Sequence, residues 1–229
     1  MKKYVIIGGG IIGSSIAREI RKRDLGDVLV LEKEHELGHH ASGRNSGVIH
    51  SGINQTPGLL KAKMCVKGSR MLRDYCRENS VPMIECGTLV IGRNSDEIGI
   101  LDKLMYMGKE IGVPDLKIIN QLELRKREPF ANGLVALLSP TGAIVDSKTL
   151  LRTVALEAES LGARYQFNAE VREISDKGKI KTKIKKIDAD FIINCAGLHA
   201  DKIAHMMGVG LDYKIIPFKG NYLSITFSY

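Results

Sequence analysis

Apolar and polar positions near the N-terminus form two short hydrophobic runs separated by an amphipathic stretch. Residues 4–7 (YVII) and 28–31 (VLVL) are runs of the length that buried strands have. Between them, residues 11–23 carry apolar side chains at helical spacing. The segment GGGIIG, residues 8–13, joins the first run to this amphipathic stretch. The order strand, glycine turn, helix, strand predicts a βαβ unit of a parallel sheet.

The rest of the chain predicts further helices and strands in mixed order. Helices are expected at residues 59–79, 96–111, 147–160 and 200–207, with a short helix starting at the capping pair Asn120 and Glu123. Strands are expected at residues 83–91 (with Gly87 as a bulge), 134–138, 143–145, 164–167, 171–174, 213–216 and 221–227. Residues 191–194 (FIIN) are expected to form a buried parallel strand. The pattern predicts an α/β fold of two discontinuous domains, with the ligand at their junction.

The glycine turn has the spacing of a dinucleotide-binding fingerprint. Gly8 allows a tight turn, Gly10 lets the backbone approach a pyrophosphate, and Gly13 lets helix and strand pack closely. The helix that follows offers free N–H groups and a positive dipole end to phosphates. Glu32 lies about 20 residues further on, where a carboxylate can accept hydrogen bonds from ribose hydroxyls. The alternative is a glycine-rich turn that holds no ligand.

Composition indicates an ordinary globular protein. Of the 229 residues, 44% are hydrophobic and 26% charged, and no apolar run reaches the length of a membrane span. The N-terminus does not read as a signal peptide, so a cytoplasmic location is expected. The four cysteines have no metal-ligand spacing and are expected to be buried free thiols. His35, His39 and His40 lie in a loop without a partnering pattern, so no metal is expected.

The net charge of +8 has an identifiable source. Much of the excess lies in residues 177–186, KGKIKTKIKK, which reads as an exposed edge strand protected by lysines. The functional alternative is weak attraction to acidic substrates or to anionic lipid at the inner face of the membrane. Nucleic acid is not expected as a partner, because aromatic residues are few and none interleaves with the run.

Three later segments suit contact with a cofactor. The long loop 33–56 contains small residues with many backbone N–H groups, which can wrap around a phosphate or a ribityl chain. Residues 192–197 (IINCAG) run from a strand into a glycine turn, and Lys219 places a cation just before an apolar run. Taken singly, each can also be an ordinary turn or a surface lysine.

Together these segments resemble the FAD-dependent amino-acid-oxidase (DAO) superfamily, and within it the L-2-hydroxyglutarate oxidase/dehydrogenase family. Almost the whole chain is covered. The motifs are the glycine turn with Glu32, SGRNSGVIHSGI (42–53), LKAKMCVKG (60–68), TGAIVD (141–146), NCAGLHADKIA (194–204) and IIPFKGNYL (215–223). Relatives on the same fold include glycerol-3-phosphate dehydrogenases and the sarcosine, glycine and proline oxidases.

The resemblance implies FAD as the cofactor. It implies a Rossmann-like FAD-binding domain (residues 1–81 and 146–211) with an inserted, incomplete α+β substrate domain (82–145 and 212–229). The implied cofactor-binding residues are Gly8, Gly10, Gly13 and Ser14 near the pyrophosphate, Glu32 on the ribose, Lys33 beside it, Ser42, Arg44, Asn45 and Ser46 along the pyrophosphate and ribityl chain, the backbone of Val171 at adenine, and Ala196 and Gly197 close to the cofactor. His50 would reach the flavin face, and Lys219 would lie near flavin and substrate.

The implied reaction oxidises a small anionic 2-hydroxy acid, L-2-hydroxyglutarate, to 2-oxoglutarate by hydride transfer to flavin N5. A neutral histidine, with an ordinary pKa of about 6.5, can take the hydroxyl proton. Arg44 or Lys219 could hold the carboxylate. Alternatives are a glycerol-3-phosphate or amino-acid oxidoreductase of the same superfamily, and an NAD-dependent dehydrogenase, which would leave the loop RNSGVIHSG unexplained.

Two departures from the family pattern affect this reading. Lys219 stands where relatives usually have arginine, and a lysine is a point charge rather than a planar fork. The sequence stops at Tyr229, whereas family members continue. This stop has three explanations. The sequence is a fragment, or the enzyme is split and a second chain supplies the rest, or the protein is truncated and binds flavin weakly or not at all. The alternative to an active enzyme is therefore a non-catalytic, flavin-binding subunit of a split oxidoreductase.

Overall fold

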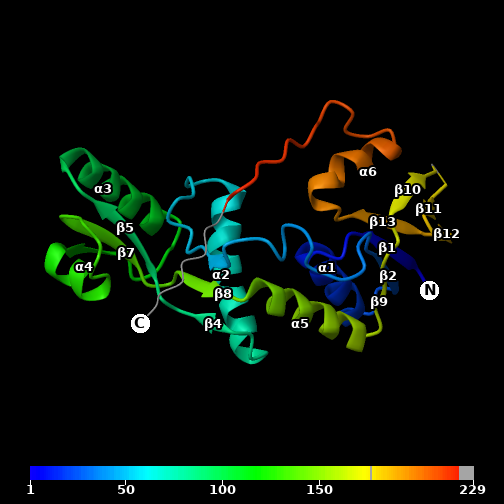
Figure 1. The fold of residues 1–229 in the computed structure, drawn as a ribbon, viewed down its shortest axis with the longest axis horizontal. Helices are drawn as coiled ribbons and strands as arrows, with labels where there is room; N and C mark the ends of the chain where they lie inside the picture. Colours follow the sequence, from blue (N-terminus) through cyan, green and yellow to red (C-terminus); the bar gives the residue numbers. More distant parts are fainter. Residues whose placement is uncertain (176, 222–229) are drawn as a thin grey trace. The chain divides into compact units, whose positions relative to one another are not determined.

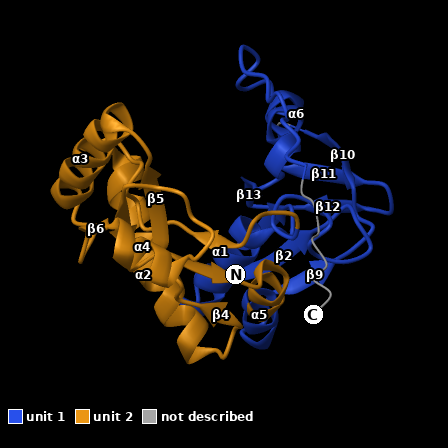
Figure 2. Ribbon diagram, turned by 60° about the vertical axis from the view of Figure 1, so that its left-hand side comes forward, with its two compact units in different colours: residues 1–43, 154–229 blue, residues 44–153 orange. Residues whose placement is uncertain are grey.

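The computed structural model describes residues 1–175 and 177–221. The chain divides into two compact units, which Figure 2 shows in different colours. Unit 1 contains residues 1–43 and 154–229, and unit 2 contains residues 44–153. Contacts thus group residues 44–81 with the inserted segment, whereas the sequence-based division placed them in the FAD-binding domain. The division by function remains a prediction.

Unit 1 is built on a parallel sheet (Figure 1). Its strands are β1 (Lys3–Ile7), β2 (Asp27–Leu31), β9 (Arg164–Gln166) and β13 (Phe191–Asn194), in the order β13-β1-β2-β9. All neighbouring pairs are parallel. Helix α1 (Ile11–Lys22) connects β1 to β2. The Rossmann-like α/β class predicted from the sequence is confirmed.

Alternate residues of β1 pack on opposite faces of this sheet, as the pleat requires. Ile6 is fully buried in a cluster that includes Ala17 and Ile20 of α1. Val5 and Ile7 belong to a second cluster on the other face. That cluster takes its other members from β2, from the segment leading into an antiparallel meander, from the meander itself and from helix α6 (Ala200–Met206). Unit 1 therefore buries both faces of β1, which explains why this strand has a continuous apolar sequence.

The antiparallel meander corrects the prediction for the lysine-rich run. Its strands are β10 (Val171–Ile174), β11 (Lys179–Thr182) and β12 (Lys186–Asp188), paired in that order. The run is two strands, not one edge strand, because the chain reverses where the Thr182 backbone N–H donates to the Lys185 carbonyl at 2.9 Å. Strand β11 is the central strand of the meander and buries Ile180 completely, while its lysines remain exposed.

Unit 2 contains two small antiparallel sheets. One has the order β3 (Val48–Ile49), β8 (Ala143–Val145), β4 (Met83–Ile84), and the other β5 (Thr88–Gly92), β7 (Val135–Ser139), β6 (Lys117–Asn120). The prediction of one strand over residues 83–91 was wrong. Gly87 has a φ of +77° and separates two strands that pair with different partners, which is a larger break than a bulge.

The helices agree closely with the sequence pattern. They are α2 (Leu60–Glu78), α3 (Ser95–Glu110), α4 (Gln121–Arg127) and α5 (Ser147–Ser160). The Asn120 side chain accepts a hydrogen bond from the Glu123 backbone at 2.9 Å, as the capping pair predicted. Asp146 caps α5 by accepting from the Lys148 and Thr149 backbones at 3.0 and 3.1 Å. Within the described ranges, none of the helices combines the length and hydropathy that a membrane crossing requires.

Three smaller expectations differ from the structure. Strand β13 is parallel but only half-buried, with Phe191 44% exposed. Residues 213–216 form no strand, since the Ile215 N–H donates to the Asp201 carboxylate at 3.0 Å instead of to a neighbouring strand. The strand expected at residues 221–227 lies, from residue 222 on, outside the described residues. Of the four cysteines, Cys76 is buried, Cys86 is exposed and the other two are intermediate.

The contact between α1 and β1 leads to a stability prediction. A Cβ added at Gly13 would lie 2.0 Å from the Gly8 carbonyl oxygen, so Gly13→Ala forces helix and strand apart. We expect the free energy of unfolding to fall by about 1–3 kcal/mol, as for overpacked cores. Gly68→Ala is the matched control: Gly68 is exposed within α2, a Cβ there meets nothing within 4 Å, and helix propensity favours alanine. Urea unfolding that shows equal stability for both variants would contradict the close contact.

The cap of α5 predicts a pH-dependent effect. Hydrogen bonds, chiefly from Thr149, hold the pKa of Asp146 below its ordinary value. The ionised cap therefore stabilises the fold fully above the unfolded pKa of about 3.9, and this contribution is lost as pH falls through the lower, folded-state pKa. We expect Asp146→Ala to cost about 1 kcal/mol at pH 7. Unfolding curves of the variant and parent protein should converge in strong acid, and a constant difference between them would argue against the cap.

Candidate functional site

The glycine turn after β1 is closely packed against neighbouring backbone. Gly8 has a φ of +107°, and its N–H donates to the Leu31 carbonyl at 2.8 Å. A Cβ on Gly8 would lie 2.3 Å from the Cys195 carbonyl oxygen, which belongs to the turn after β13. The carboxyl ends of β13, β1 and β2 thus converge on a backbone surface that no side chain could share. Such a surface is what close approach of a pyrophosphate needs.

Glu32 is held by two backbone amides at the end of β2. One carboxylate oxygen accepts from the Gly9 N–H at 2.9 Å, and the other from the Glu34 N–H at 3.0 Å. The residue is only 9% exposed, and its own N–H donates to Gln166 of β9 at 2.9 Å. Because a carboxylate has about four lone-pair sites, these two bonds leave acceptor capacity for ribose hydroxyls. The structure thus fixes the orientation that ribose binding would need.

Two serines lie at the start of α1. The Ser42 hydroxyl accepts from the Ile11 N–H at 3.0 Å, and a Cβ on Gly10 would lie 2.9 Å from the same hydroxyl oxygen. Ser42 therefore meets one of the first-turn amides that have no partner within the helix. Ser14 is completely buried and donates to the Gly9 carbonyl at 3.2 Å, which supports the turn from within. Contacts of both serines with a pyrophosphate remain predictions.

Beside Glu32, the structure shows a cluster that the sequence reading largely missed. Lys33 Nζ lies 3.2 Å from His199 Nε2 and 3.4 Å from the Glu34 carboxylate, which also contacts His40 at 2.8 Å. The hydrogen bond with His40 lowers the pKa of Glu34. Burial, followed by the charge of Lys33, lowers the pKa of His199 and favours its neutral form. Lys33 and His199 follow β2 and β13, which lie on either side of β1, so their meeting depends on the order of the strands in the sheet.

The remaining predicted residues of unit 1 lie in several places. Val171 begins β10 in register with Thr182, and its side chain is buried. The Ala196 N–H donates to the Asn194 side-chain oxygen at 3.2 Å. Gly197 has a φ of +55°, and none of the described atoms lies within 4 Å of its Cβ position. Lys219 is exposed and lies in no helix or strand. Their contacts with a cofactor stay predictions.

The other predicted residues belong to unit 2. Arg44, Asn45 and Ser46 are exposed, and the Asn45 side chain accepts from the Gly47 N–H at 2.8 Å. His50 is exposed directly after β3, and its carbonyl oxygen lies 3.8 Å from Cys65 Sγ. An exposed imidazole directly after a short paired strand is accessible to a reactant. Its catalytic role remains a prediction.

Three potential metal ligands gather in the loop after β2, where no metal was expected. The ligand atoms of His35, Glu36 and His39 lie within 4.8 Å of one another, and His35 and Glu36 are exposed. The two imidazole rings lie 4.6 Å apart, edge to face. Exposed groups of this kind are common without an ion, so the cluster assigns no metal by itself.

Taken together, the groups of unit 1 fit an adenine dinucleotide. A cradle that a Cβ would fill, the N-terminus of a helix and a buried, oriented carboxylate lie at one edge of the parallel sheet. Comparison with known proteins agrees. The model of the DAO family, described as FAD dependent oxidoreductase, matches residues 3–228.

Curated relatives extend over nearly all of this chain. The mitochondrial L-2-hydroxyglutarate dehydrogenase of Homo sapiens is 37% identical over 235 residues, which cover 96% of this chain and 51% of that protein. The L-2-hydroxyglutarate dehydrogenase of Indibacter alkaliphilus is 36% identical, covering 97% of this chain and 57% of its own length. The chain therefore spans about half the length of the curated relatives it matches.

Solved structures show the same fold. The L-alpha-glycerophosphate oxidase of Mycoplasma pneumoniae with FAD bound has a TM-score of 0.80 and 27% identity, covering 91% of this chain and 58% of that one. The L-proline dehydrogenase of P. horikoshii has a TM-score of 0.79 and 25% identity, covering 91% and 56%. With a family model matched from end to end and FAD as the family's cofactor, the chain belongs to the DAO family of FAD-dependent oxidoreductases.

Proposed function

We propose that this chain is the FAD-binding part of an oxidoreductase that converts L-2-hydroxyglutarate to 2-oxoglutarate. The observation that carries the cofactor is the buried Glu32 carboxylate, bound to the Gly9 N–H within the glycine turn. The substrate class is supported by relatives named L-2-hydroxyglutarate dehydrogenase, which are 36–37% identical across almost the whole chain. The substrate is a small dianion, and a chain with a net charge of +8 attracts it.

The cofactor would be held mainly by backbone. Gly8, Gly10 and Gly13 keep the surface of the turn free of side chains, and the N-terminus of α1 offers positive partial charge to the diphosphate. Glu32 would accept from the ribose hydroxyls, with Lys33 beside it. When bound, FAD supplies a two-electron acceptor whose N5 takes up the hydride of the substrate carbon.

His50 is proposed as the general base. A neutral imidazole would accept the proton of the substrate hydroxyl while the C–H bond breaks and the C=O bond of the 2-oxo acid forms. The electron pair leaves with the hydride, so the oxidation balances without a further reactant at this step. Arg44 or Lys219 would hold a substrate carboxylate, with the lysine acting as a point charge.

Two other readings compete with this proposal. Fold neighbours named as acting on glycerophosphate and on proline make these chemistries the rivals within the family. A non-catalytic subunit is the rival from another class, because the chain spans about half of its curated relatives. The two experiments below separate these readings.

The first experiment tests the cofactor site. Purified protein incubated with FAD should show the visible absorbance of bound flavin after gel filtration. Glu32→Gln should weaken FAD binding by roughly tenfold or more, because the ribose and the Gly9 N–H lose a charged acceptor. Glu36→Gln is the matched control on the exposed part of the following loop and should leave binding unchanged. Absence of bound flavin in the parent protein, or equal loss in both variants, would refute the site.

The second experiment tests the reaction. Under anaerobic conditions, L-2-hydroxyglutarate should bleach the bound flavin, whereas glycerol 3-phosphate and L-proline should not. His50→Asn should slow this reduction by about 10²–10⁴-fold while flavin is retained, and His35→Asn, an exposed loop histidine, should not slow it. Bleaching by a rival substrate alone would move the assignment to that chemistry. Flavin that no candidate reduces would favour the non-catalytic subunit.

A further inference from the structure

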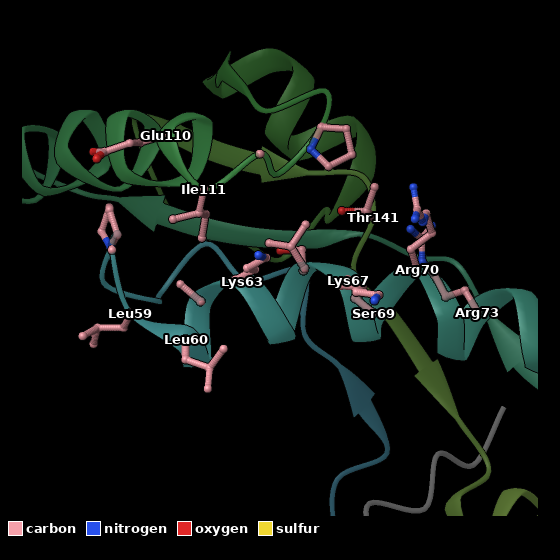
Figure 3. A pocket seen from close by; sticks show the side chains of 17 residues that line it. Leu59, Leu60, Lys63, Lys67, Ser69, Arg70, Arg73, Glu110, Ile111 and Thr141 are labelled. Carbon is pink, nitrogen blue, oxygen red and sulfur yellow. The ribbon is translucent and has the colours of Figure 1, made fainter. Parts of the chain in front are cut away.

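Unit 2 contains a pocket that lies outside every residue assigned to the cofactor. It runs along one side of α2 and has a volume of about 900 Å³. Figure 3 shows Thr141 and Arg70 near one end of the pocket and Leu59 toward the other, with Lys63 and Lys67 on the helix between them. This volume is in the range of sites that hold small organic molecules.

Several residues that line this pocket contain buried polar atoms without partners. Ser51 and Ser69 are 4% and 7% exposed, and neither hydroxyl has a hydrogen-bond partner in the described part of the chain. The Thr141 hydroxyl and Arg73 Nε are likewise buried and unpaired there. All of these residues line the same pocket. Because unpaired buried polar groups destabilise a fold, four in one pocket indicate that it receives a ligand with hydrogen-bonding capacity.

The charge of the lining favours an anion. Among described residues, Lys63, Lys67 and Arg70 form no ion pair, whereas Arg73 contacts the Glu85 carboxylate at 3.0 Å. Glu110 is the acidic residue of the lining. Cations therefore outnumber carboxylates in the pocket, so the surplus charge there is positive.

The start of α2 adds to this positive potential. Its N-cap residue, Leu59, provides no capping side chain, and the first turn contains no acidic residue. Lysines in this turn are repelled by the positive end of the helix dipole, and Lys63 itself lines the pocket. An anion in the pocket would offset both the dipole and the lysine charge.

The rest of the lining is apolar. Ala62, Val66 and Ile111 lie along the pocket, and Val66 and Ile111 also pack against the core cluster of unit 2.

We propose that this pocket is a binding site for an amphiphilic organic anion, whose acidic head meets Ser69, Lys67 and Arg70 and whose hydrocarbon body lies against the apolar lining. The head is a carboxylate or a phosphate monoester. The site goes beyond the proposed oxidation and does not depend on FAD.

The test is calorimetric titration of the purified chain with four probes. Octanoate and octyl phosphate carry both required features, octanol lacks the charge, and inorganic phosphate lacks the hydrocarbon body. We expect the two amphiphilic anions to bind at least tenfold more tightly than either control probe. The tighter of the two identifies the head group. Octanol binding as tightly as octanoate, or no binding of any probe at about 1 mM, would overturn the proposal.

Variants test the location. The double variant K67Q/R70Q should weaken octanoate binding by roughly tenfold, since both charged donors to the head are lost. Lys61→Gln is the matched control, because Lys61 is exposed on α2 but does not line the pocket. It should change affinity by less than twofold. Equal weakening in both variants would show general charge attraction and would overturn the assignment.

Ser69→Ala supplies a signature that a merely structural serine would not give. Removing an unpaired buried hydroxyl should leave the ligand-free protein as stable as the parent or more stable. The same change should weaken octanoate binding at least threefold, because the head loses a donor. Destabilisation of the free protein with unchanged octanoate affinity would instead mean that the hydroxyl serves the fold and would refute its role in the site.

Discussion

The hydrogen bond between the Glu32 carboxylate and the Gly9 N–H is the interaction on which the candidate cofactor site depends. It joins the end of β2 to the turn after β1 at 2.9 Å, and both residues are buried. Without it, a buried carboxylate and a buried amide would both lose a partner, which is costly on each side. The same carboxylate orders Glu34, and through Glu34 the cluster with Lys33 and His40. Fold and site are therefore linked through one side chain.

The features that the sequence predicted well are those that depend on local geometry. GGGIIG with its flanking apolar runs specified the turn, α1 and the two strands, because each step is determined by residues within a few positions of one another. Capping at Asn120 and Asp146 was readable for the same reason. The strand over residues 83–91 failed because Gly87 changes the pairing partner, and pairing depends on segments far along the chain.

For site residues too, local arrangements could be predicted from the sequence and contacts between distant segments could not. Gly8, Gly13 and Glu32 could be placed from spacing alone, since a fingerprint encodes one turn and one strand end. The contact of His199 with Lys33 could not, because it joins residues 166 positions apart and depends on the order of the strands. The pocket of unit 2 was equally invisible to periodicity. Its residues come from α2, from the loop before α2 and from turns further along the chain, and the unpaired buried hydroxyls among them are seen only in the structure.

The pairing of β1 with β13 has a consequence for synthesis on the ribosome. Lys3 contacts Asp190 across 187 positions, and the Gly8 turn packs against Cys195. One edge of the first strand therefore stays unpaired during synthesis until the residues of β13 have been made. Closure of so long a loop is entropically slow. The backbone surface at the glycine turn is therefore completed only after β13 has been made, long after the turn itself.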